Sequence, residues 1–461
     1  MKTIKIGGGC LKGHEVISNI VDLIVQRGRG NVFVLSALHG VTDKLLDGIE
    51  RALKNEDEIP AIISGLKEEH YSLMRHLLKN DDDFEKLHQE LDKVFLKIER
   101  YYFGINFTRE ITPRMHDIIA SYGERLSVIL MAGVLKSRGE NASYIMPQDA
   151  GVITDGRFGD ATANMPLTSQ NFEKNVLPLI LPDNNSKVSD KILFFPGFFG
   201  ISESGEITTF GRGGSDYSAA VVAASLKADT LEIWKDTEGF MSADPHSISD
   251  AKLIPVLSYE EASELAYTGA SILHPRTVEP VRKSGINITI KNTLNPDGVG
   301  SLITEFAVPA DSVVKSISHT KDIGMIKIYA SGVGLRRGIL GKIATTISKA
   351  GINIRSVVTS HTCISLMFTR KDVDKAHAVL TSMKPKLYRE SEQITDNALI
   401  CVVGDGLHNH IGIAAKCFAA VSNAGVNIEM ISYGPSKAAL YFMVDEGDLD
   451  ITLKSLHAHF V

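Results

Sequence analysis

Short apolar segments of strand type alternate with helical segments along the first two thirds of this 461-residue chain. Strand patterns occupy residues 2–6 and 230–234, apolar runs of buried-strand type occupy residues 31–36 and 191–195, and helical patterns separate them. Continuous apolar runs of this length are typical of parallel strands that are covered on both faces. Strands that alternate with helices in this way predict one large α/β domain, which we place at residues 1–296.

A glycine-rich turn runs directly into a helical segment at residues 208–224, which read Thr-Thr-Phe-Gly-Arg-Gly-Gly-Ser-Asp-Tyr-Ser-Ala-Ala-Val-Val-Ala-Ala. Glycines let the backbone approach a ligand closely, and the first N–H groups of a helix attract anions. Arg212 offers a planar fork for a carboxylate or phosphate, and Asp216 offers an oxygen for a metal or an ammonium group. The segment predicts an anion site, with a plain turn and an N-cap at Ser215 as the alternative.

Two further strand-to-helix turns carry polar side chains. Lys5 ends the first strand before Gly7 and Gly8, which is a geometry that can cradle phosphates. A tight turn with a solvated lysine is the alternative interpretation. The second strand is followed by Ser36 and Thr42, whose hydroxyls either hold a substrate or, at Thr42, cap the next helix.

Charged side chains also occur where apolar neighbours predict burial or where a strand ends. Glu124 lies in a long apolar helical pattern that begins at Pro113. Because a buried, unpaired carboxylate is costly, Glu124 needs a cation, either Arg125 or a ligand ammonium group. Lys235 and Asp236 start a polar loop at the carboxyl end of a strand, which is where open α/β sheets bind ligands.

The last third of the chain contains an internal repeat. Residues 338–354 match residues 412–428 with an offset of 74 (412 minus 338). Each copy reads as a strand, a glycine loop, an amphipathic helix that ends at Ala-Gly, and a strand that begins at Asn. Two copies predict tandem modules, which we place at residues 315–390 and 391–461, after a linker at residues 297–314.

Composition narrows the classes of protein that need to be considered. The formal net charge of −6 argues against a nucleic-acid or anionic-membrane partner. The four cysteines lack metal-site spacing and are expected to be reduced thiols. No segment has the long apolar run of a signal peptide or a membrane span, so we expect a cytoplasmic protein.

Five segments and the repeat, in this order, resemble aspartate kinases along nearly the whole chain. The segments are Lys-Ile-Gly-Gly at residues 5–8, Gly-Glu-Arg-Leu-Ser at 123–127, the glycine turn at 208–219, and residues 234–245 and 269–275. The repeat is similar to the paired ACT domains of that family. The resemblance implies a three-layer αβα amino-acid-kinase fold with a mainly parallel central sheet, followed by two ACT-like βαββαβ modules.

The resemblance also implies an activity, the transfer of the ATP γ-phosphoryl group to the side-chain carboxylate of L-aspartate. The product would be 4-phospho-L-aspartate, the first intermediate of lysine, threonine and methionine biosynthesis. Lys5 would neutralise the transferring group, and Asp216 would lie near the reacting centre and Mg²⁺. The implied nucleotide-binding residues are Lys5, Gly7 and Gly8 (through their N–H groups), Ser36, Lys235, Asp236, Met241 and Ser271. The implied aspartate-binding residues are Thr42 and Glu124 for the amino group, Arg212 for the α-carboxylate, and Phe158 and Gly159.

Some positions depart from the family pattern. Gly9 and Cys10 replace the usual Thr-Ser, and Ser271 replaces a lysine. Met241 and His246 stand where many relatives have Tyr and Arg. Each change predicts weaker ATP binding, so we expect a working kinase that is slower or serves a side pathway.

The ACT-like modules imply feedback control by an end-product amino acid and assembly into a homo-oligomer. The implied effector-binding residues are Val333, Ile339, Leu340, Asn353, Ile354, Arg355, Ser360 and His361. Lysine-sensing relatives place acidic residues where Arg355 and His361 stand here, and a cationic ligand beside Arg355 is unfavourable. The hypothesis is that threonine, or no amino acid, is the effector rather than lysine.

Two other functions remain as alternatives. A kinase for another acidic amino acid, such as N-acetylglutamate, would lack the ACT tandem and would not need Arg212 and Glu124 to hold a zwitterion. A sensor that has lost its kinase activity is suggested by Gly9, Cys10 and Ser271, but the presence of Lys5 and Asp216 argues against it.

Overall fold

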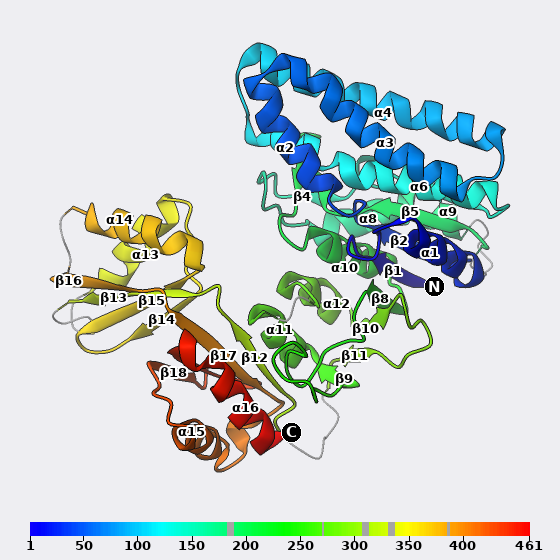
Figure 1. Cartoon of the computed structure of the whole chain (residues 1–461). Helices are drawn as coiled ribbons and strands as arrows, with labels where there is room; N and C mark the ends of the chain where they lie inside the picture. Colours follow the sequence, from blue (N-terminus) through cyan, green and yellow to red (C-terminus); the bar gives the residue numbers. More distant parts are fainter. Residues whose placement is uncertain (182–188, 270–271, 307–312, 331–336, 385–387) are drawn as a thin grey trace. The chain divides into compact units, whose positions relative to one another are not determined.

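The computed structural model describes residues 1–181, 189–269, 272–306, 313–330, 337–384 and 388–461. The chain divides into two compact units, which are coloured by sequence in Figure 1. The first unit comprises Met1–Phe240, Pro255–Tyr259 and Ile272–Ala307, and the second comprises Met241–Ile254, Glu260–Ser271 and Val308–Val461. Two segments before residue 296 therefore group with the C-terminal unit. The boundaries predicted at residues 296, 314 and 390 stay predictions.

An eight-stranded sheet forms the centre of the first unit, in the order β3-β5-β2-β1-β8-β10-β11-β9. Its neighbouring strands pair in parallel except β10 and β11, which are antiparallel. The strands are β1 (Lys2–Ile6), β2 (Val32–Leu35), β3 (Ala142–Tyr144), β5 (Ile192–Pro196), β8 (Thr230–Lys235), β9 (Val256–Ser258), β10 (Asn287–Asn292) and β11 (Ser301–Thr304). A smaller sheet joins β4 (Ile153–Thr154), β6 (Phe199–Ser202) and β7 (Ile207–Thr209).

Helices cover both faces of the large sheet, which gives the three layers. On one face α6 packs on β2, β3 and β5 and contacts α1, while α3 and α4 lie beyond α6; on the other, α10 packs on β1, β2 and β8 beside α8 and α12. The helices up to residue 283 are α1 (His14–Arg27), α2 (Val41–Lys54), η1 (Glu56–Glu58), α3 (Ile59–Leu77), α4 (Asp81–Thr108), α5 (Pro113–Ala120), α6 (Tyr122–Ser137), α7 (Pro147–Ala150), α8 (Met165–Asn175), α9 (Leu177–Ile180), α10 (Gly214–Leu226), α11 (Tyr259–Tyr267), η2 (Pro275–Thr277) and α12 (Val278–Lys283).

The single helix predicted from Pro113 is in fact two helices, α5 and α6, which meet at Ser121. The Ser121 hydroxyl donates a hydrogen bond back to the Ile118 carbonyl (2.7 Å), a contact that tends to bend helices. By length and composition the stretch Pro113–Ser137 could cross a membrane, but 89% of its most apolar 18-residue window is buried within the fold. It therefore has the burial expected of a core helix.

The alternation of side chains along β1 explains how one strand serves both core and site. Ile4 and Ile6 belong to the apolar core that also contains the α1 residues Ile17 and Ile20. Lys5 points to the opposite face, where α10 lies. Successive residues of a strand face opposite sides of a sheet, so one buried strand supplies both core and a charged group.

The second unit contains two four-stranded antiparallel sheets, ordered β14-β15-β13-β16 and β12-β17-β19-β18. Its elements are β12 (Ser316–Thr320), β13 (Gly324–Tyr329), α13 (Ile339–Lys349), β14 (Ser356–Thr359), β15 (Cys363–Phe368), η3 (Arg370–Asp372), α14 (Val373–Thr381), β16 (Glu390–Ile394), β17 (Asn397–Val403), η4 (Leu407–Asn409), α15 (Ile413–Asn423), β18 (Met430–Tyr433), β19 (Ala439–Asp445), η5 (Glu446–Asp448) and α16 (Leu449–Phe460).

The predicted repeat corresponds to equivalent elements in the two sheets. The helices α13 and α15 both follow a left-handed glycine N-cap, Gly338 (φ 83°) and Gly412 (φ 88°). The first strands of the two copies, however, are exchanged. β12 pairs with β17 of the second copy, and β16 pairs with β13 of the first. The mainly parallel three-layer unit and the paired antiparallel sheets confirm the predicted fold class.

Candidate active site

A buried cluster of charges joins β1, β8 and α10. Lys5 Nζ lies 2.5 Å from Asp216 Oδ1, and Lys235 Nζ lies 3.4 Å from Asp216 Oδ2. Burial alone would raise the pKa of Asp216, but the two lysines hold it below its usual value. Burial lowers the pKa of Lys235, although Asp216 opposes this shift. Two ammonium groups around one carboxylate leave an excess of positive charge, which suits an anionic phosphate.

The glycine turn after β1 is only partly available to a ligand. Gly7 N–H donates to the Trp234 carbonyl (3.2 Å), so it continues the sheet ladder and is not the free donor that the sequence predicted. No acceptor among the described residues bonds the Gly8 N–H. A Cβ on Gly8 would lie 3.2 Å from the Ala37 carbonyl, so the turn packs closely against the end of β2. The Gly7 N–H is therefore engaged within the sheet, and the nucleotide-binding role of both glycines stays a prediction.

Glu124 in the first turn of α6 is buried, being 4% exposed, and its Oε2 has no hydrogen-bond partner among the residues that the structure describes. Burial raises the pKa of Glu124 to about 8, although the Ala37 backbone and the Ser215 side chain oppose the rise. Arg125 is not the cation that Glu124 needs, because its guanidinium bonds Ser121 Oγ and lies over the Phe199 ring. Of the two cations considered for Glu124, a ligand ammonium group remains.

Thr42 lies beside this carboxyl and does not cap α2. The N-cap of α2 is Gly40, in the left-handed conformation, which makes no side-chain cap hydrogen bond. A Cβ on Gly123 would lie 3.3 Å from Thr42 Oγ1 and 2.7 Å from Ala37 Cβ. Gly123 therefore lets the start of α6 approach the turn after β2, which brings Glu124 near Thr42.

The glycine-rich turn before α10 places Arg212 at the surface of the unit. Gly213 (φ 71°) is the N-cap of α10, so the helix begins one residue before Ser215, and Ser215 is not its cap. No carboxylate in the described part of the chain pairs with Arg212. A Cβ on Gly211 would lie 2.7 Å from the Gly159 carbonyl, so this turn touches the loop that carries the predicted residues Phe158 and Gly159.

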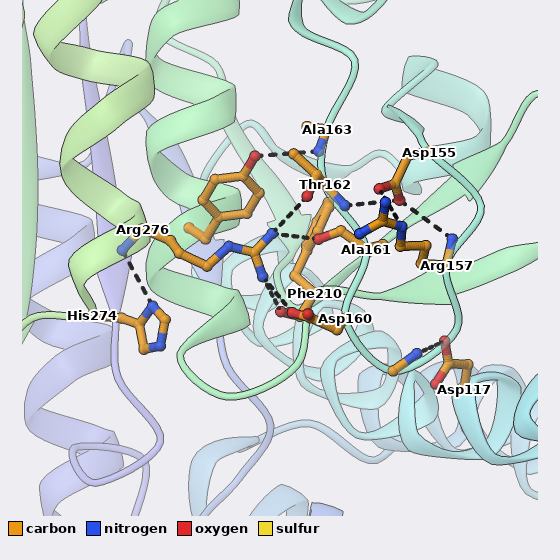
Figure 2. Close-up of polar contacts among 12 residues, drawn as sticks. Asp117, Asp155, Arg157, Asp160, Ala161, Thr162, Ala163, Phe210, His274 and Arg276 are labelled. Atoms are coloured by element: carbon orange, nitrogen blue, oxygen red, sulfur yellow. Dashed lines mark hydrogen bonds and ion pairs between the residues drawn. The ribbon is translucent and has the colours of Figure 1, made fainter. Parts of the chain in front are cut away.

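Asp117 in α5 joins that loop to β7 and was not found by sequence reasoning. Its carboxylate accepts hydrogen bonds from Gly159 N–H (2.8 Å), Thr209 N–H (2.8 Å) and Thr209 Oγ1 (2.9 Å). Figure 2 shows Asp117 at one side of the loop and Arg276 at the other. The sequence gives no local signal for Asp117, because its partners lie 42 and 92 residues away.

Two cavities bring most of the predicted residues together. One of about 570 Å³ is lined by residues that include Lys5, Ser36, Asp43, Gly159, Arg212 and Asp216. The other, of about 250 Å³, is lined by residues that include Gly8, Gly9, Ser36, Thr42, Asp43 and Glu124. Ser36 and Asp43 line both, so the cavities adjoin. Asp43 was also missed, although it directly follows Thr42 in the same turn.

The predicted nucleotide-binding residues Asp236 and Met241 are not among the residues that line these two cavities. Asp236 is exposed after β8, and a Cβ on Gly9 would lie 3.4 Å from its Oδ2. Met241 belongs to the second unit, where its carbonyl accepts a hydrogen bond from Ser316 Oγ (2.8 Å). Ser271 lies outside the described residues.

The donor set does not form a protein cage for a metal ion. No group of three or more His, Cys, Asp and Glu side chains in the described ranges is placed to hold one. Both oxygens of Asp216 face lysine ammonium groups instead. The predicted metal role of Asp216 therefore gains no support from its surroundings.

The predicted effector residues differ in burial. Ile339 belongs to the core around α13, and Ile354 packs against it. Arg355 donates to the Asp322 carbonyl (2.7 Å), and its guanidinium lies 3.6 Å from the Asp322 carboxylate. The exposed members of the set are Leu340, Asn353, Ser360 and His361. Val333 lies outside the described residues, and the effector role of this set stays a prediction.

Comparison with protein families shows the family to which the chain that carries this site belongs. The sequence profile described as the amino acid kinase family matches residues 2–292. The chain belongs to the amino acid kinase family. A second profile, described as an ACT domain, matches residues 400–460 and so covers much of the second copy of the repeat in this amino acid kinase.

Relatives with known names match nearly the full length of this amino acid kinase. The bifunctional aspartokinase/homoserine dehydrogenase of Haemophilus influenzae and aspartokinase 1, chloroplastic, of Arabidopsis thaliana are each 29% identical over 99% of the chain. The chain spans 56% of the first relative and 79% of the second, and only just over half of the bifunctional relatives. The resemblance to aspartate kinases that the motifs predicted is confirmed.

Solved structures agree on the fold. The structure of aspartokinase III from E. coli in complex with aspartate and ADP is 23% identical, with a TM-score of 0.82, and covers 100% of this chain and 99% of that one. The aspartate kinase of Clostridium acetobutylicum is 25% identical, with a TM-score of 0.76 and the same coverage.

Proposed function

We propose that this amino acid kinase is an aspartate kinase, which transfers the γ-phosphoryl group of ATP to the side-chain carboxylate of L-aspartate. The observation that carries the proposal is a carboxyl group and a guanidinium group that line adjoining cavities, neither of which forms an ion pair within the described residues. Glu124 offers a buried carboxyl whose Oε2 bonds no group in the described part of the chain, and Arg212 offers a guanidinium that no described carboxylate pairs. Together they match the ammonium and α-carboxylate groups of an amino acid.

The charges around Lys5 fit the phosphoryl side of this reaction. Phosphoryl transfer needs positioning and charge neutralisation more than covalent catalysis. Lys5, which lines the larger cavity, and Lys235, which pairs with the same carboxylate, supply two cations, and Gly8 in the smaller cavity supplies an N–H donor. The attacking carboxylate of aspartate is already ionised at pH 7, so the reaction requires no protein base.

Mg²⁺ would enter this site with the nucleotide, because the described residues form no cage of their own. Mg²⁺ commonly keeps several waters and binds substrate phosphates rather than an all-protein site. When bound, it would supply charge neutralisation to the phosphates. The protein groups identified here bind and orient the substrates.

A hydroxamate assay with ATP, Mg²⁺ and L-aspartate tests the proposal. Lys5→Ala is expected to lower kcat by about 100-fold or more, as for the loss of a transition-state donor. Arg212→Ala is expected to raise the KM for aspartate by at least about tenfold, because one charged hydrogen bond contributes about 1.5–3 kcal/mol. Turnover of N-acetyl-L-glutamate in place of L-aspartate would contradict the proposal. No turnover with retained effector binding would favour the sensor.

We further propose threonine rather than lysine as the effector. The exposed predicted residues include no carboxylate for a second ammonium group, and Arg355 already pairs with Asp322. Initial rates measured against both amino acids distinguish them, and inhibition by lysine alone would overturn this proposal. A homo-oligomer through the ACT-like modules and a cytoplasmic location stay predictions, the first of which light scattering tests.

A further inference from the structure

Arg276 lies in η2 and makes a dense set of polar contacts outside the two cavities. Its Nη1 donates to Asp160 Oδ1 (2.9 Å) and to the Phe210 carbonyl (3.0 Å). Its Nη2 donates to the Ala161 carbonyl (2.5 Å) and to Thr162 Oγ1 (3.1 Å). Figure 2 shows the guanidinium between these groups. A planar guanidinium with several fixed N–H donors is required for such a set, and a lysine ammonium cannot reproduce it.

The contacts of Arg276 join three segments that are distant in sequence. Asp160, Ala161 and Thr162 belong to the loop that carries Phe158 and Gly159, and Phe210 is the residue before the glycine-rich turn. The guanidinium carbon also lies 4.7 Å from the ring centroid of Tyr217 in α10.

Tyr217 makes a further contact with the same loop. Its hydroxyl accepts a hydrogen bond from Ala163 N–H (3.2 Å), the next residue of the same loop. The loop is thus held by Arg276 and Tyr217 on one side and by Asp117, through Gly159, on the other.

The chain just before Arg276 supports the turn itself. His274 Nδ1 accepts a hydrogen bond from Arg276 N–H (3.4 Å). A Cβ on Gly213 would lie only 2.3 Å from His274 Cγ, so the imidazole ring packs directly against the turn that presents Arg212. Burial lowers the pKa of His274, with the nearby Arg276 adding to this shift, which favours a neutral ring whose Nδ1 can accept.

We infer that Arg276 is a positioning residue for the amino-acid substrate, because it holds the loop that carries Gly159 and the residue before the turn that carries Arg212, without being among the residues that line either cavity. Both segments line the larger cavity, whereas Lys5 and Lys235 are placed by β1 and β8. Loss of the Arg276 contacts therefore affects binding of the amino acid and leaves binding of the nucleotide largely unchanged. The substrate named here rests on the proposed function.

The test compares Arg276→Lys with Arg157→Lys in the full-length chain. Arg157 lies in the same loop, but its side chain is 77% exposed and its guanidinium pairs only at 3.5 Å with Asp155. Arg276→Lys is expected to raise the KM for L-aspartate by about tenfold or more, because the displaced loop and turn no longer align the groups that bind it, with the KM for ATP within about twofold. Arg157→Lys is expected to match the wild type. Added ethylguanidinium is expected to restore part of the aspartate binding lost in Arg276→Ala.

Hydrogen exchange measured on the same variants separates this inference from the proposed function. In Arg276→Lys the amides of residues 155–163 and 211–214 are expected to exchange faster than in the wild type and in Arg157→Lys. If the wild type does not turn over L-aspartate, the proposed function fails, but the exchange result still tests the positioning role. Unchanged exchange in both segments, or equal rises in both KM values, would overturn the inference.

Discussion

Glu124 is a buried carboxyl of the site whose pKa is shifted upward. Its folded pKa of about 8 lies well above the ordinary value of 4.5, because burial penalises the charged form. At pH 7 most of the ligand-free protein therefore carries Glu124 protonated. On the proposed function, an ammonium group of the amino acid bound at Glu124 would favour the ionised form, so its binding near neutral pH would release a proton.

The sign of this shift predicts how stability depends on pH. Between pH 4.5 and 8 the folded chain keeps a proton on Glu124 that the unfolded chain has lost, so the contribution is full below pH 4.5 and decreases as pH rises toward 8. The free energy of unfolding of the wild type, relative to Glu124→Gln, is expected to fall by up to about 1.4 kcal/mol per pH unit.

Urea denaturation of both proteins at several pH values between 5 and 8 measures this difference. Glu124→Gln is the matched control, since it keeps the shape of the side chain and removes the titration. A difference between the two proteins that does not change with pH would show that Glu124 titrates at its ordinary value.

Local motifs identified some site residues and missed others for a physical reason. Lys5, Glu124 and Arg212 could be predicted because each stands beside glycines or within an apolar helical pattern that constrains its surroundings. Asp117 and Arg276 could not, because their partners lie up to 92 and 116 residues away in the sequence. Their roles follow only from tertiary packing.

At the scale of elements, the turn before α10 depends strongly on a single glycine, Gly213, and the sequence alone does not show this dependence. Gly213 has φ 71°, and a Cβ there would meet the His274 ring at 2.3 Å. Gly205 has φ 82° in the turn between β6 and β7, but a Cβ there would meet nothing within 4 Å. Both positions thus have a left-handed backbone that a side chain would strain. They differ because a Cβ at Gly213 would also collide with His274.

Gly213→Ala is expected to reduce kcat/KM for L-aspartate by about 100-fold or more, because the turn must shift and misplace Arg212. Gly205→Ala is expected to cost about 1 kcal/mol of stability from its left-handed backbone and to leave the kinetics unchanged. Steady-state rates and thermal melts of both variants provide the measurement. Equal kinetic losses in the two variants would contradict the importance of the His274 contact.

Sequence patterns predicted most helices and strands. They did not give the correct helix boundary at the start of α10 or between α5 and α6. Glycines at residues 211, 213 and 214 showed that a turn precedes α10, but not which glycine would cap the helix. Gly213 takes that position rather than Ser215, because the left-handed conformation favours glycine. Similarly, apolar periodicity continued across Ser121, and only the structure separates α5 from α6.

At the scale of the whole molecule, the internal repeat predicted two modules but not the exchange of their first strands. β12 and β16 occupy equivalent places in the two copies, since Ser316 and Glu390 are 74 residues apart. Either strand could in principle pair within its own copy. The choice depends on the path of the chain in three dimensions, which a periodic sequence does not encode.

The exchange predicts that the second copy is unstable alone. A fragment of residues 397–461 would lack β12, which pairs over five residues with β17, and β17 is buried along its whole length. This fragment is expected to aggregate or remain unfolded because a long apolar edge is exposed. A fragment of residues 313–461 keeps both sheets and is expected to unfold cooperatively. Circular dichroism melts and size-exclusion chromatography compare them, and a monomeric, cooperative melt of the shorter fragment would contradict the prediction.

The strand exchange also limits how the gene can change. Removal of either 74-residue copy would take away a strand that completes the sheet of the copy that stays. Changes that keep both sheets complete are therefore confined to substitutions within a retained pair of segments.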